Sequence, residues 1–252
     1  MAYGDADHGS VQHCADDLRA AAAQSRPSGK RGLWLSFLDA YGLEVSVLTS
    51  ADWLGVDLQH GVLEPGDVPG LLRVAEKADL PLLTRVSSHD AATIGRVLDA
   101  GVQGVIVPAV ESADEARALA SACLSPPRGK RSAGVARSAL GVVSGGSDPL
   151  LLPMVETADG LERVDEILAV DGIDGVFVGP YDLSLSMGFP APSSPQTIEA
   201  LRHVMSQARS AGKIVGFYAA HPTLAELAPE ADLVAIDSDV TALRLGLAQL
   251  FG

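Results

Sequence analysis

Two acidic residues stand where the sequence could build a metal site. Glu156 directly follows the apolar run 150–155, and Asp182 lies four residues after the apolar run 175–178. If these runs are neighbouring parallel strands, their axes lie about 4.8 Å apart and both carboxylates reach the same edge of the sheet. Two carboxylates placed in this way repel each other and favour a cation between them, and water and substrate oxygens would complete an open octahedral site for Mg²⁺ or Mn²⁺. The alternative is that each acid caps the helix that comes after it.

Arg85 and His60 are further candidates, because each lies near the end of a predicted strand. Arg85 belongs to the run 81–86, and a guanidinium there would suit an anionic substrate carboxylate or enolate oxygen. A salt bridge to an acid at the same edge is equally open. His60 follows the run 53–58 and could move a proton near neutral pH, or it could simply pack.

The lysines argue against one kind of aldolase chemistry. The chain has four lysines, Lys30, Lys77, Lys130 and Lys213, and none lies at the carboxyl end of a predicted strand. A Schiff-base mechanism needs a desolvated lysine inside the site, so it is disfavoured. A metal ion would then have to withdraw the electrons instead.

Charge and cysteine usage narrow the partners and the setting. The net charge of −14 argues against nucleic acid and against an anionic membrane surface. Cys14 and Cys123 form no paired-cysteine metal motif, which fits a cytoplasmic protein without disulfides. The first residues lack the basic and apolar regions of a signal peptide, and no apolar run approaches the ~18 residues of a membrane-spanning helix.

The spacing of apolar runs predicts the fold that would position these residues. Short apolar runs alternate with longer amphipathic stretches, which is typical of βα units and a parallel sheet. Eight such units favour an α/β fold of the (β/α)8 TIM barrel type over a doubly wound sheet, whose G-x-G-x-x-G fingerprint is missing after the first strand. We therefore predict an N-terminal arm over 1–31 and a barrel catalytic domain over 32–252. The predicted strands are 33–38, 53–58, 81–86, 104–110, 150–155, 175–178, 213–218 and 233–236.

Helical patterns separate these strands. Ser112 and Glu115 have the spacing of a capping box and predict the start of one helix. The segment 125–148 breaks the rhythm, and we expect it to be a loop on the barrel face where active sites form, either functional or merely solvated. The predicted helices are 14–23, 65–78, 91–100, 114–123, 158–170, 197–211, 223–227 and 241–250.

Three motifs resemble one enzyme family. Residues 52–61 (DWLGVDLQHG), 153–157 (PMVET) and 172–184 (GIDGVFVGPYDLS) resemble the metal-dependent, class II 2-oxoacid aldolases. That family includes 4-hydroxy-2-oxoheptanedioate aldolase and 2-dehydro-3-deoxyglucarate aldolase, with the citrate lyase beta subunit as a distant relative. The resemblance extends from about residue 32 to residue 252, and the third motif, with a glutamate 26 residues before its aspartate, is the most specific.

The resemblance implies a role for each candidate residue. It makes Glu156 and Asp182 the ligands of a divalent cation (Mg²⁺, Mn²⁺ or Co²⁺), and it places Arg85 on the 2-oxo group and the developing enolate. His60 becomes the acid–base residue, and Asp99 is the acid that pairs with such a histidine. Because Asp99 ends a predicted helix on the opposite face of the barrel, we expect it to serve a neighbouring subunit. The residues expected to line the substrate site are Arg85, Met154, Gly179, Pro180 and Asp182.

The sequence departs from the family pattern in three places. Met154 stands where many members carry glutamine, Gln59 replaces an acid common before the histidine, and the segment 125–148 is short, with Arg131 and Ser132 in place of the usual Arg-Gly. The first two departures put the identity of the 2-oxoacid donor in doubt. The third puts the acceptor pocket and the subunit contacts in doubt.

The resemblance also implies an activity and an assembly. We expect a lyase that cleaves or forms a carbon–carbon bond of a 4-hydroxy-2-oxoacid through a metal-stabilised, pyruvate-type enolate, with small 2-oxoacids and aldehydes as partners. The alternatives are an oxaloacetate decarboxylase or macrophomate-synthase-like enzyme, a lyase of coenzyme A esters, which the acidic balance disfavours, and a non-catalytic barrel that binds or assembles. We expect a homo-oligomer, a hexamer built as a trimer of dimers or smaller, in which the C-terminal helix is exchanged between subunits.

Overall fold

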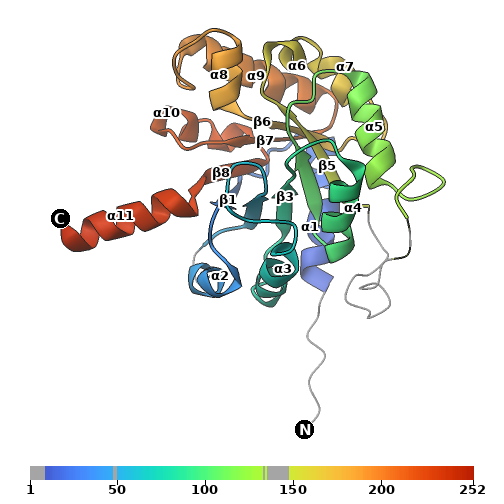
Figure 1. Cartoon of the computed structure of the whole chain (residues 1–252). Coiled ribbons are helices and arrows are strands. Elements are labelled where there is room, and N and C mark those ends of the chain that lie inside the picture. The colour runs from blue at the N-terminus through green and yellow to red at the C-terminus, as the bar shows by residue number, and fades with distance from the viewer. Residues whose placement is uncertain (1–8, 48–49, 133, 135–147) are drawn as a thin grey trace.

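The chain forms one closed barrel of eight parallel strands, which confirms the predicted (β/α)8 TIM barrel. The computed structural model describes residues 9–47, 50–132, 134 and 148–252. Each strand pairs with the next in chain order, and β8 pairs with β1 to close the ring (Figure 1). The strands are β1 (Lys30–Leu35), β2 (Trp53–Asp57), β3 (Leu82–Arg85), β4 (Gly104–Val107), β5 (Leu150–Val155), β6 (Gly175–Val178), β7 (Ile214–Tyr218) and β8 (Leu233–Ser238).

Successive side chains of each strand point alternately into the barrel and out toward the helices, which gives the protein an inner and an outer apolar core. Trp34, Trp53 and Phe177 fill the barrel interior, where their rings pack against one another with centroids 5.6–6.4 Å apart. Two glycines make room for them, since a Cβ on Gly32 would lie 2.2 Å from the Trp53 ring and a Cβ on Gly55 would lie 2.5 Å from the Trp34 ring. The outward-facing Val, Leu and Ile side chains pack under the helices instead.

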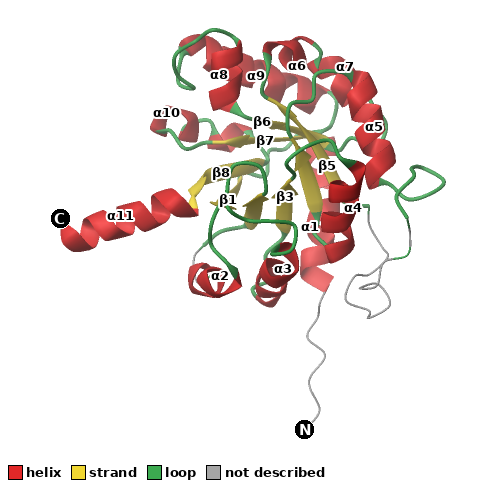
Figure 2. Ribbon diagram, in the orientation of Figure 1, coloured by secondary structure: helices red, strands yellow, loops and turns green. Residues whose placement is uncertain are grey.

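The helices surround the strands as the pattern predicts, with three differences (Figure 2). The predicted helix 158–170 is divided in two, because the backbone at Arg163 leaves the helical region (φ −109°, ψ 16°). Two short helices, α2 and α8, were not predicted. The helices are α1 (Gly9–Ala23), α2 (Ala40–Ser46), α3 (Val68–Lys77), α4 (Ala91–Ala100), α5 (Ala113–Cys123), α6 (Ala158–Glu162), α7 (Val164–Leu168), α8 (Pro180–Ser186), α9 (Pro195–Ser210), α10 (Pro222–Ala225) and α11 (Asp239–Phe251), with a 3-10 turn η2 (Ala228–Glu230).

The first strand lies three residues earlier than predicted. The backbone N–H groups of Ser36, Phe37 and Leu38, which fall within the predicted strand, all donate to the carboxylate of Asp239 at 3.0 Å. They are therefore unavailable to a strand ladder, and β1 instead begins at Lys30, paired with Leu233.

The described part of the segment 125–148 does not lie on the expected face of the barrel. Helix α5 carries the chain back to the end of the barrel where strands begin, so this segment starts away from the expected active-site face. The described residues agree, because Arg131 donates to the Cys123 carbonyl at 2.7 Å and Arg128 pairs with Asp148, just before β5. Residues 133 and 135–147 lie outside the described part of the chain.

Helix α1, within the predicted N-terminal arm, closes the end of the barrel where the strands begin. Ala15, Leu18 and Ala22 are buried and belong to the same apolar cluster as the barrel interior. Arg19 fixes the helix there by donating from Nε to Asp174 at 2.6 Å, directly before β6. The side chains that fill the barrel and helix α1 together cover this end. The opposite end, where the strands finish, is therefore the open end of the barrel.

Helix α11 has a different environment from the other long helices, because it extends away from the barrel (Figure 1). Only its first residue, Asp239, is buried. Leu250 and Phe251 are 77% and 85% exposed, which is unusual for large apolar side chains. Among the described residues, no helix combines the length and the apolar character that crossing a membrane requires. The exposed apolar residues of α11 are Val240, Leu243, Leu245, Leu247, Leu250 and Phe251.

Candidate active site at the open end of the barrel

A buried ion pair joins the last residues of β2 and β3 at the open end of the barrel. Arg85 donates to both oxygens of Asp57, from Nε to Oδ1 at 2.9 Å and from Nη2 to Oδ2 at 2.5 Å. The two residues are register partners and both are buried, with exposed fractions of 9% and 3%. Burial by itself would raise the pKa of Asp57, but the hydrogen bonds and charge of Arg85 lower it below its usual value.

Trp34 holds the same pair from the other side. Its indole Nε1 donates to Asp57 Oδ2 at 3.2 Å, and its ring lies 5.3 Å below the guanidinium carbon of Arg85. A cation over an indole face is attracted by the ring quadrupole. The position and orientation of Arg85 are therefore set by one carboxylate and one aromatic ring. Asp57 engages Nε and Nη2 of Arg85, and no hydrogen bond from Nη1 occurs among the described residues.

Glu156 lies at the end of β5 and is also buried. Its Oε1 accepts a hydrogen bond of 2.7 Å from the backbone N–H of Ala109, in the loop after β4. Burial raises the pKa of Glu156, and the nearby negative charge of Asp182 raises it further, while the Ala109 hydrogen bond and the Arg85 charge oppose the rise. The carboxylate therefore lies within the electrostatic range of both Asp182 and Arg85, and its charge is costly without a cation.

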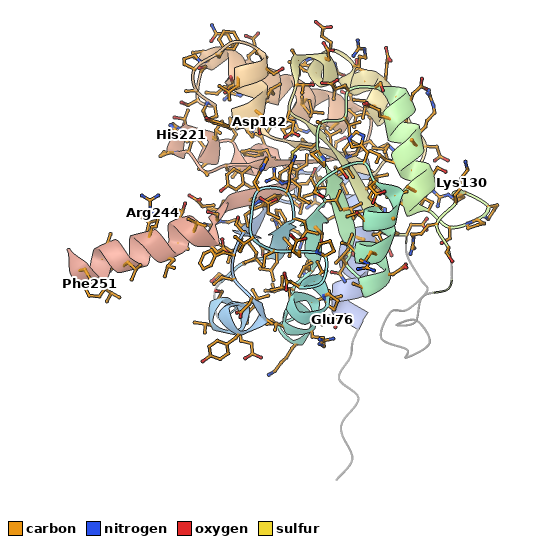
Figure 3. The ribbon with its side chains drawn as sticks, viewed as in Figure 1. Glu76, Lys130, Asp182, His221, Arg244 and Phe251 are labelled. Atoms are coloured by element: carbon orange, nitrogen blue, oxygen red, sulfur yellow. The ribbon has the colours of Figure 1, made fainter. Side chains whose placement is uncertain are left out.

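Asp182 lies shortly after β6, the next strand along the chain. Gly179 follows β6, and Pro180 begins α8, so that the exposed carboxylate of Asp182 lies in the first turn of that helix (Figure 3). Gly179 also fixes how closely the two strands approach, because a Cβ there would lie 2.9 Å from Glu156 Oε2 and 3.5 Å from the sulfur of Met154. Pro180 and Met154 are buried beside them. Five of the residues predicted from the sequence to bind metal or substrate thus lie around the ends of β5 and β6: Met154, Glu156, Gly179, Pro180 and Asp182.

His60 lies on the loop after β2, and its side chain is exposed. Its backbone N–H donates to Asp57 Oδ1 at 3.2 Å, and that of Gln59 donates to the same oxygen at 2.9 Å. The loop is pressed against β1, since a Cβ on Gly61 would lie 2.3 Å from the Ser36 carbonyl oxygen. The carboxylate that orients Arg85 therefore also places the backbone of His60.

Comparison with known proteins identifies the family to which this arrangement belongs. Residues 30–243 match the family described as HpcH/HpaI aldolase/citrate lyase. The chain belongs to this family. It is 34% identical to a hydroxypyruvate/pyruvate aldolase of Sagittula stellata, over 84% of this chain and 88% of the relative. It is 39% identical to a 2-keto-3-deoxy-L-rhamnonate aldolase of Klebsiella pneumoniae, over 82% of each chain.

The fold comparison agrees with the sequence comparison. A HpcH/HpaI aldolase/citrate lyase family protein of Burkholderia cenocepacia superposes with a TM-score of 0.80 at 28% identity, covering 94% of this chain and 99% of the other. The resemblance drawn from the three sequence motifs is therefore confirmed. The HpcH/HpaI family assignment makes this chain a carbon–carbon lyase.

One predicted site residue of this HpcH/HpaI enzyme lies apart from the others. Asp99 is in the last turn of α4, so it lies at the end of the barrel where strands begin, whereas His60 follows the end of a strand. Its carboxylate is half-exposed and accepts a hydrogen bond of 3.0 Å from Arg131 of the same chain. A role for Asp99 toward a neighbouring subunit stays a prediction.

The structure adds residues that the sequence reasoning did not assign. Asp57 and Trp34 are the partners of Arg85, and Tyr218 lies with them, its ring centroid 5.8 Å from that of Trp34. Strand alternation was the signal that could have found them. Asp57 has the same parity as Trp53, and Tyr218 has the same parity as Ile214, and both of these reference side chains fill the barrel.

Proposed function

We propose that this chain is a divalent-metal-dependent aldolase that cleaves or forms the C3–C4 bond of a 4-hydroxy-2-oxoacid through a pyruvate-type enolate. One observation carries the proposal: the buried carboxylate of Glu156 lies where the charge of Asp182 raises its pKa, at the end of the barrel where Asp57 also orients the guanidinium of Arg85. A site with two carboxylates and one guanidinium suits a cation and an anionic substrate together. The names of the relatives support the same reaction class.

The residues present fit a divalent cation. Glu156 Oε1 is engaged by the Ala109 N–H, and the missing Cβ of Gly179 leaves space beside Oε2. Carboxylate oxygens are preferred ligands of Mg²⁺ and Mn²⁺. No group of three or more His, Cys, Asp or Glu side chains that could hold a metal occurs within the described residues. Glu156 and Asp182 would therefore hold Mg²⁺, Mn²⁺ or Co²⁺ with water or substrate oxygens completing its coordination.

When bound, the cation would polarise the 2-oxo group and lower the cost of forming the enolate. Arg85 would bind the anionic oxygens of the substrate through the donors that Asp57 leaves free. His60 would move the proton between the aldehyde-side hydroxyl and solvent, either directly or through water. Met154, Gly179 and Pro180 would line the donor side, where Met154 offers the 2-oxoacid an apolar contact.

The direct test is metal-dependent exchange of the C3 protons of pyruvate in deuterated water, followed by aldol addition to a panel of aldehydes. We expect exchange with Mg²⁺, Mn²⁺ or Co²⁺ that Glu156→Gln and Asp182→Asn both abolish, while the control Glu162→Gln, an exposed acid on α6, retains it. Oxaloacetate decarboxylation without aldol addition would favour the decarboxylase alternative. Absence of exchange, and of thermal stabilisation by metal with oxalate, would favour a binding protein.

We further propose that the enzyme is a homo-oligomer in which α11 of one subunit packs on another. Six large apolar side chains of this helix are exposed, a concentration that usually marks an interface. Tyr41 and Val45 on α2 are exposed as well and offer an apolar surface for it. Light scattering should show an oligomer for the unmodified chain and smaller species for the double variant Leu247→Glu, Leu250→Glu. A monomer before substitution would contradict the proposal.

Assembly would also explain the position of Asp99. In an oligomer its carboxylate could face the His60 of another subunit, and Arg131 would then hold it in place. Mixing an inactive Asp99→Ala variant with an inactive His60→Ala variant tests this. Hybrid oligomers should regain part of the activity because some sites would contain both native residues. No recovery in proven hybrids would place both roles within one chain or remove that of Asp99.

A further inference from the structure

Two polar residues on β7 and β8 face the open end of the barrel and have no part in the enolate chemistry proposed for Arg85, Glu156 and Asp182. Tyr218 is the last residue of β7, and Asp237 is the penultimate residue of β8, the neighbouring strand. Ile214, which fills the barrel, lies four positions before Tyr218 on β7, so the Tyr218 side chain points inward. The register of β8 shifts between Ala235 and Asp237, and there the hydrogen bond from Tyr218 Oη places the Asp237 carboxylate beside the inward-pointing phenol. Both are half-buried, which leaves them accessible from the open end.

The pair is held in a fixed position relative to Arg85. Tyr218 Oη donates to Asp237 Oδ1 at 3.4 Å, and the same oxygen accepts from the Ser238 N–H at 2.7 Å. The phenol ring packs edge-on against Trp34, with 63° between the planes, and Trp34 lies under the guanidinium of Arg85. Tyr218 and Asp237 are thus linked to Arg85 through Trp34 on β1, the strand that pairs with β8.

The chemistry of the pair is selective. Burial raises the pKa of Tyr218 to about 12, and the charge of Asp237 adds to the rise, so the phenol keeps its proton as a hydrogen-bond donor. Within the described part of the chain Asp237 forms no ion pair, so hydrogen bonds from Tyr218 and Ser238 are what stabilise its charge there. The Asp237 carboxylate can accept from an alcohol, and the phenol can turn its one proton from Asp237 to the alcohol oxygen, whereas the carboxylate repels a second carboxylate.

We propose that Tyr218 and Asp237 form the acceptor subsite of this enzyme, which accepts neutral hydroxylated aldehydes and disfavours aldehydes that carry a carboxylate. The inference rests on the proposed aldolase function. The 2-oxoacid donor would occupy Arg85, Glu156 and Asp182, on β3 and around the ends of β5 and β6. The rest of that end is bordered by β7, β8, β1 and the loop after β2 that carries His60. The aldehyde would lie there, with Tyr218 and Asp237 on one side of it.

Glycolaldehyde and glyoxylate test the inference, because they have the same chain length and differ in a hydroxymethyl against a carboxylate group. With pyruvate as donor, we expect kcat/KM of the unmodified enzyme to favour glycolaldehyde. Asp237→Asn should lower the glycolaldehyde-to-glyoxylate ratio of kcat/KM about tenfold, since two carboxylates a few ångströms apart near a protein surface repel by at least the ~1.4 kcal/mol that a tenfold ratio represents. Tyr218→Phe should raise KM for glycolaldehyde several-fold more than for glyoxylate.

The matched control is Asp171→Asn, an exposed acid at the other end of the barrel, which should leave the ratio unchanged. The ratio is insensitive to a general loss of active enzyme, so partial misfolding of a variant cannot imitate the effect. A ratio within about twofold of the unmodified value in both Asp237→Asn and Tyr218→Phe would overturn the subsite. Failure of the unmodified enzyme to exchange pyruvate protons would instead overturn the aldolase function and the subsite with it.

Discussion

The buried pair of Asp57 and Arg85 leads to a prediction about stability that is independent of the reaction. Asp57→Ala would remove the acceptor for two hydrogen bonds from Arg85, for the Trp34 indole and for two backbone N–H groups. Arg85, only 9% exposed, would keep its charge without that carboxylate. Arg85→Met would have the reverse effect and leave the Asp57 carboxylate buried without its cation.

The structure sets the expected size of the effect. Removing one partner of a buried pair typically costs about 3–5 kcal/mol of unfolding free energy, because the remaining charge is uncompensated. For a chain of this length each kcal/mol corresponds to about 2–4 °C in Tm, so each single variant should lose roughly 6–20 °C. The double variant Asp57→Ala, Arg85→Met leaves neither charge unpaired. It should therefore be no less stable than either single variant.

Urea unfolding of the four metal-free proteins, followed by tryptophan fluorescence at one protein concentration, measures this directly. Arg117→Met is the control, because Arg117 forms an exposed pair with Asp114 on α5 and its loss should cost less than about 1 kcal/mol. Single variants that lose under about 1 kcal/mol, or a double variant whose loss is the sum of the two, would refute the reasoning.

Other residues of the structure support three further predictions. Gly179→Ala should weaken Mn²⁺ binding about threefold to tenfold, as measured by calorimetric titration. The added Cβ would lie 2.9 Å from Glu156 Oε2 and would displace that side chain at a rotamer cost of about 0.5–1.5 kcal/mol. Gly95→Ala is the control, because a Cβ there meets nothing within 4 Å. The pKa of Asp57 in the folded protein is lowered from 3.8, so its pairing with Arg85 should contribute its full stabilisation above pH 3.8. That stabilisation should be lost as the pH falls through the lowered pKa. The unfolding free energy of Asp57→Asn should therefore depend less steeply on pH in that acid range. The Cys123 thiol, buried and with its pKa raised to about 12, should react with a disulfide reagent only at the unfolding rate in a Cys14→Ser background, so fast reaction in the folded protein would contradict the described packing.

The regular part of the fold could be predicted because it repeats. Apolar runs at strand spacing indicated all eight strands, and Ser112 indeed accepts from the Glu115 N–H at 3.2 Å, as the capping-box spacing predicts. Helices α2 and α8 were missed because each is only seven residues long and depends on its first residues, an Asp39 side-chain cap and Pro180. Such short helices lack the apolar periodicity on which the prediction relied.

The candidate site was predictable only in part, for a different reason. Arg85 could be recognised as a candidate from its position at a strand end. The sequence could not decide whether its guanidinium binds a substrate or pairs with an acidic side chain of the protein. The structure shows that Asp57 takes the inner half of its donors, a pairing across strands whose register the sequence does not reveal. The described residues of the segment 125–148 lie at the other end of the barrel from the predicted one, because α5 runs back along the barrel before the segment begins.

Asp239 begins α11 and at the same time binds the N–H groups of residues 36–38, next to the open end of the barrel. The Asp239 side chain therefore connects α11 by hydrogen bonds to residues 36–38, a loop beside the candidate active site. Any tilt of that helix must either carry the loop with it or break three hydrogen bonds to a charged acceptor, at about 1.5–3 kcal/mol each. In the proposed oligomer, where α11 packs on another subunit, dissociation and loss of turnover should consequently occur together on dilution.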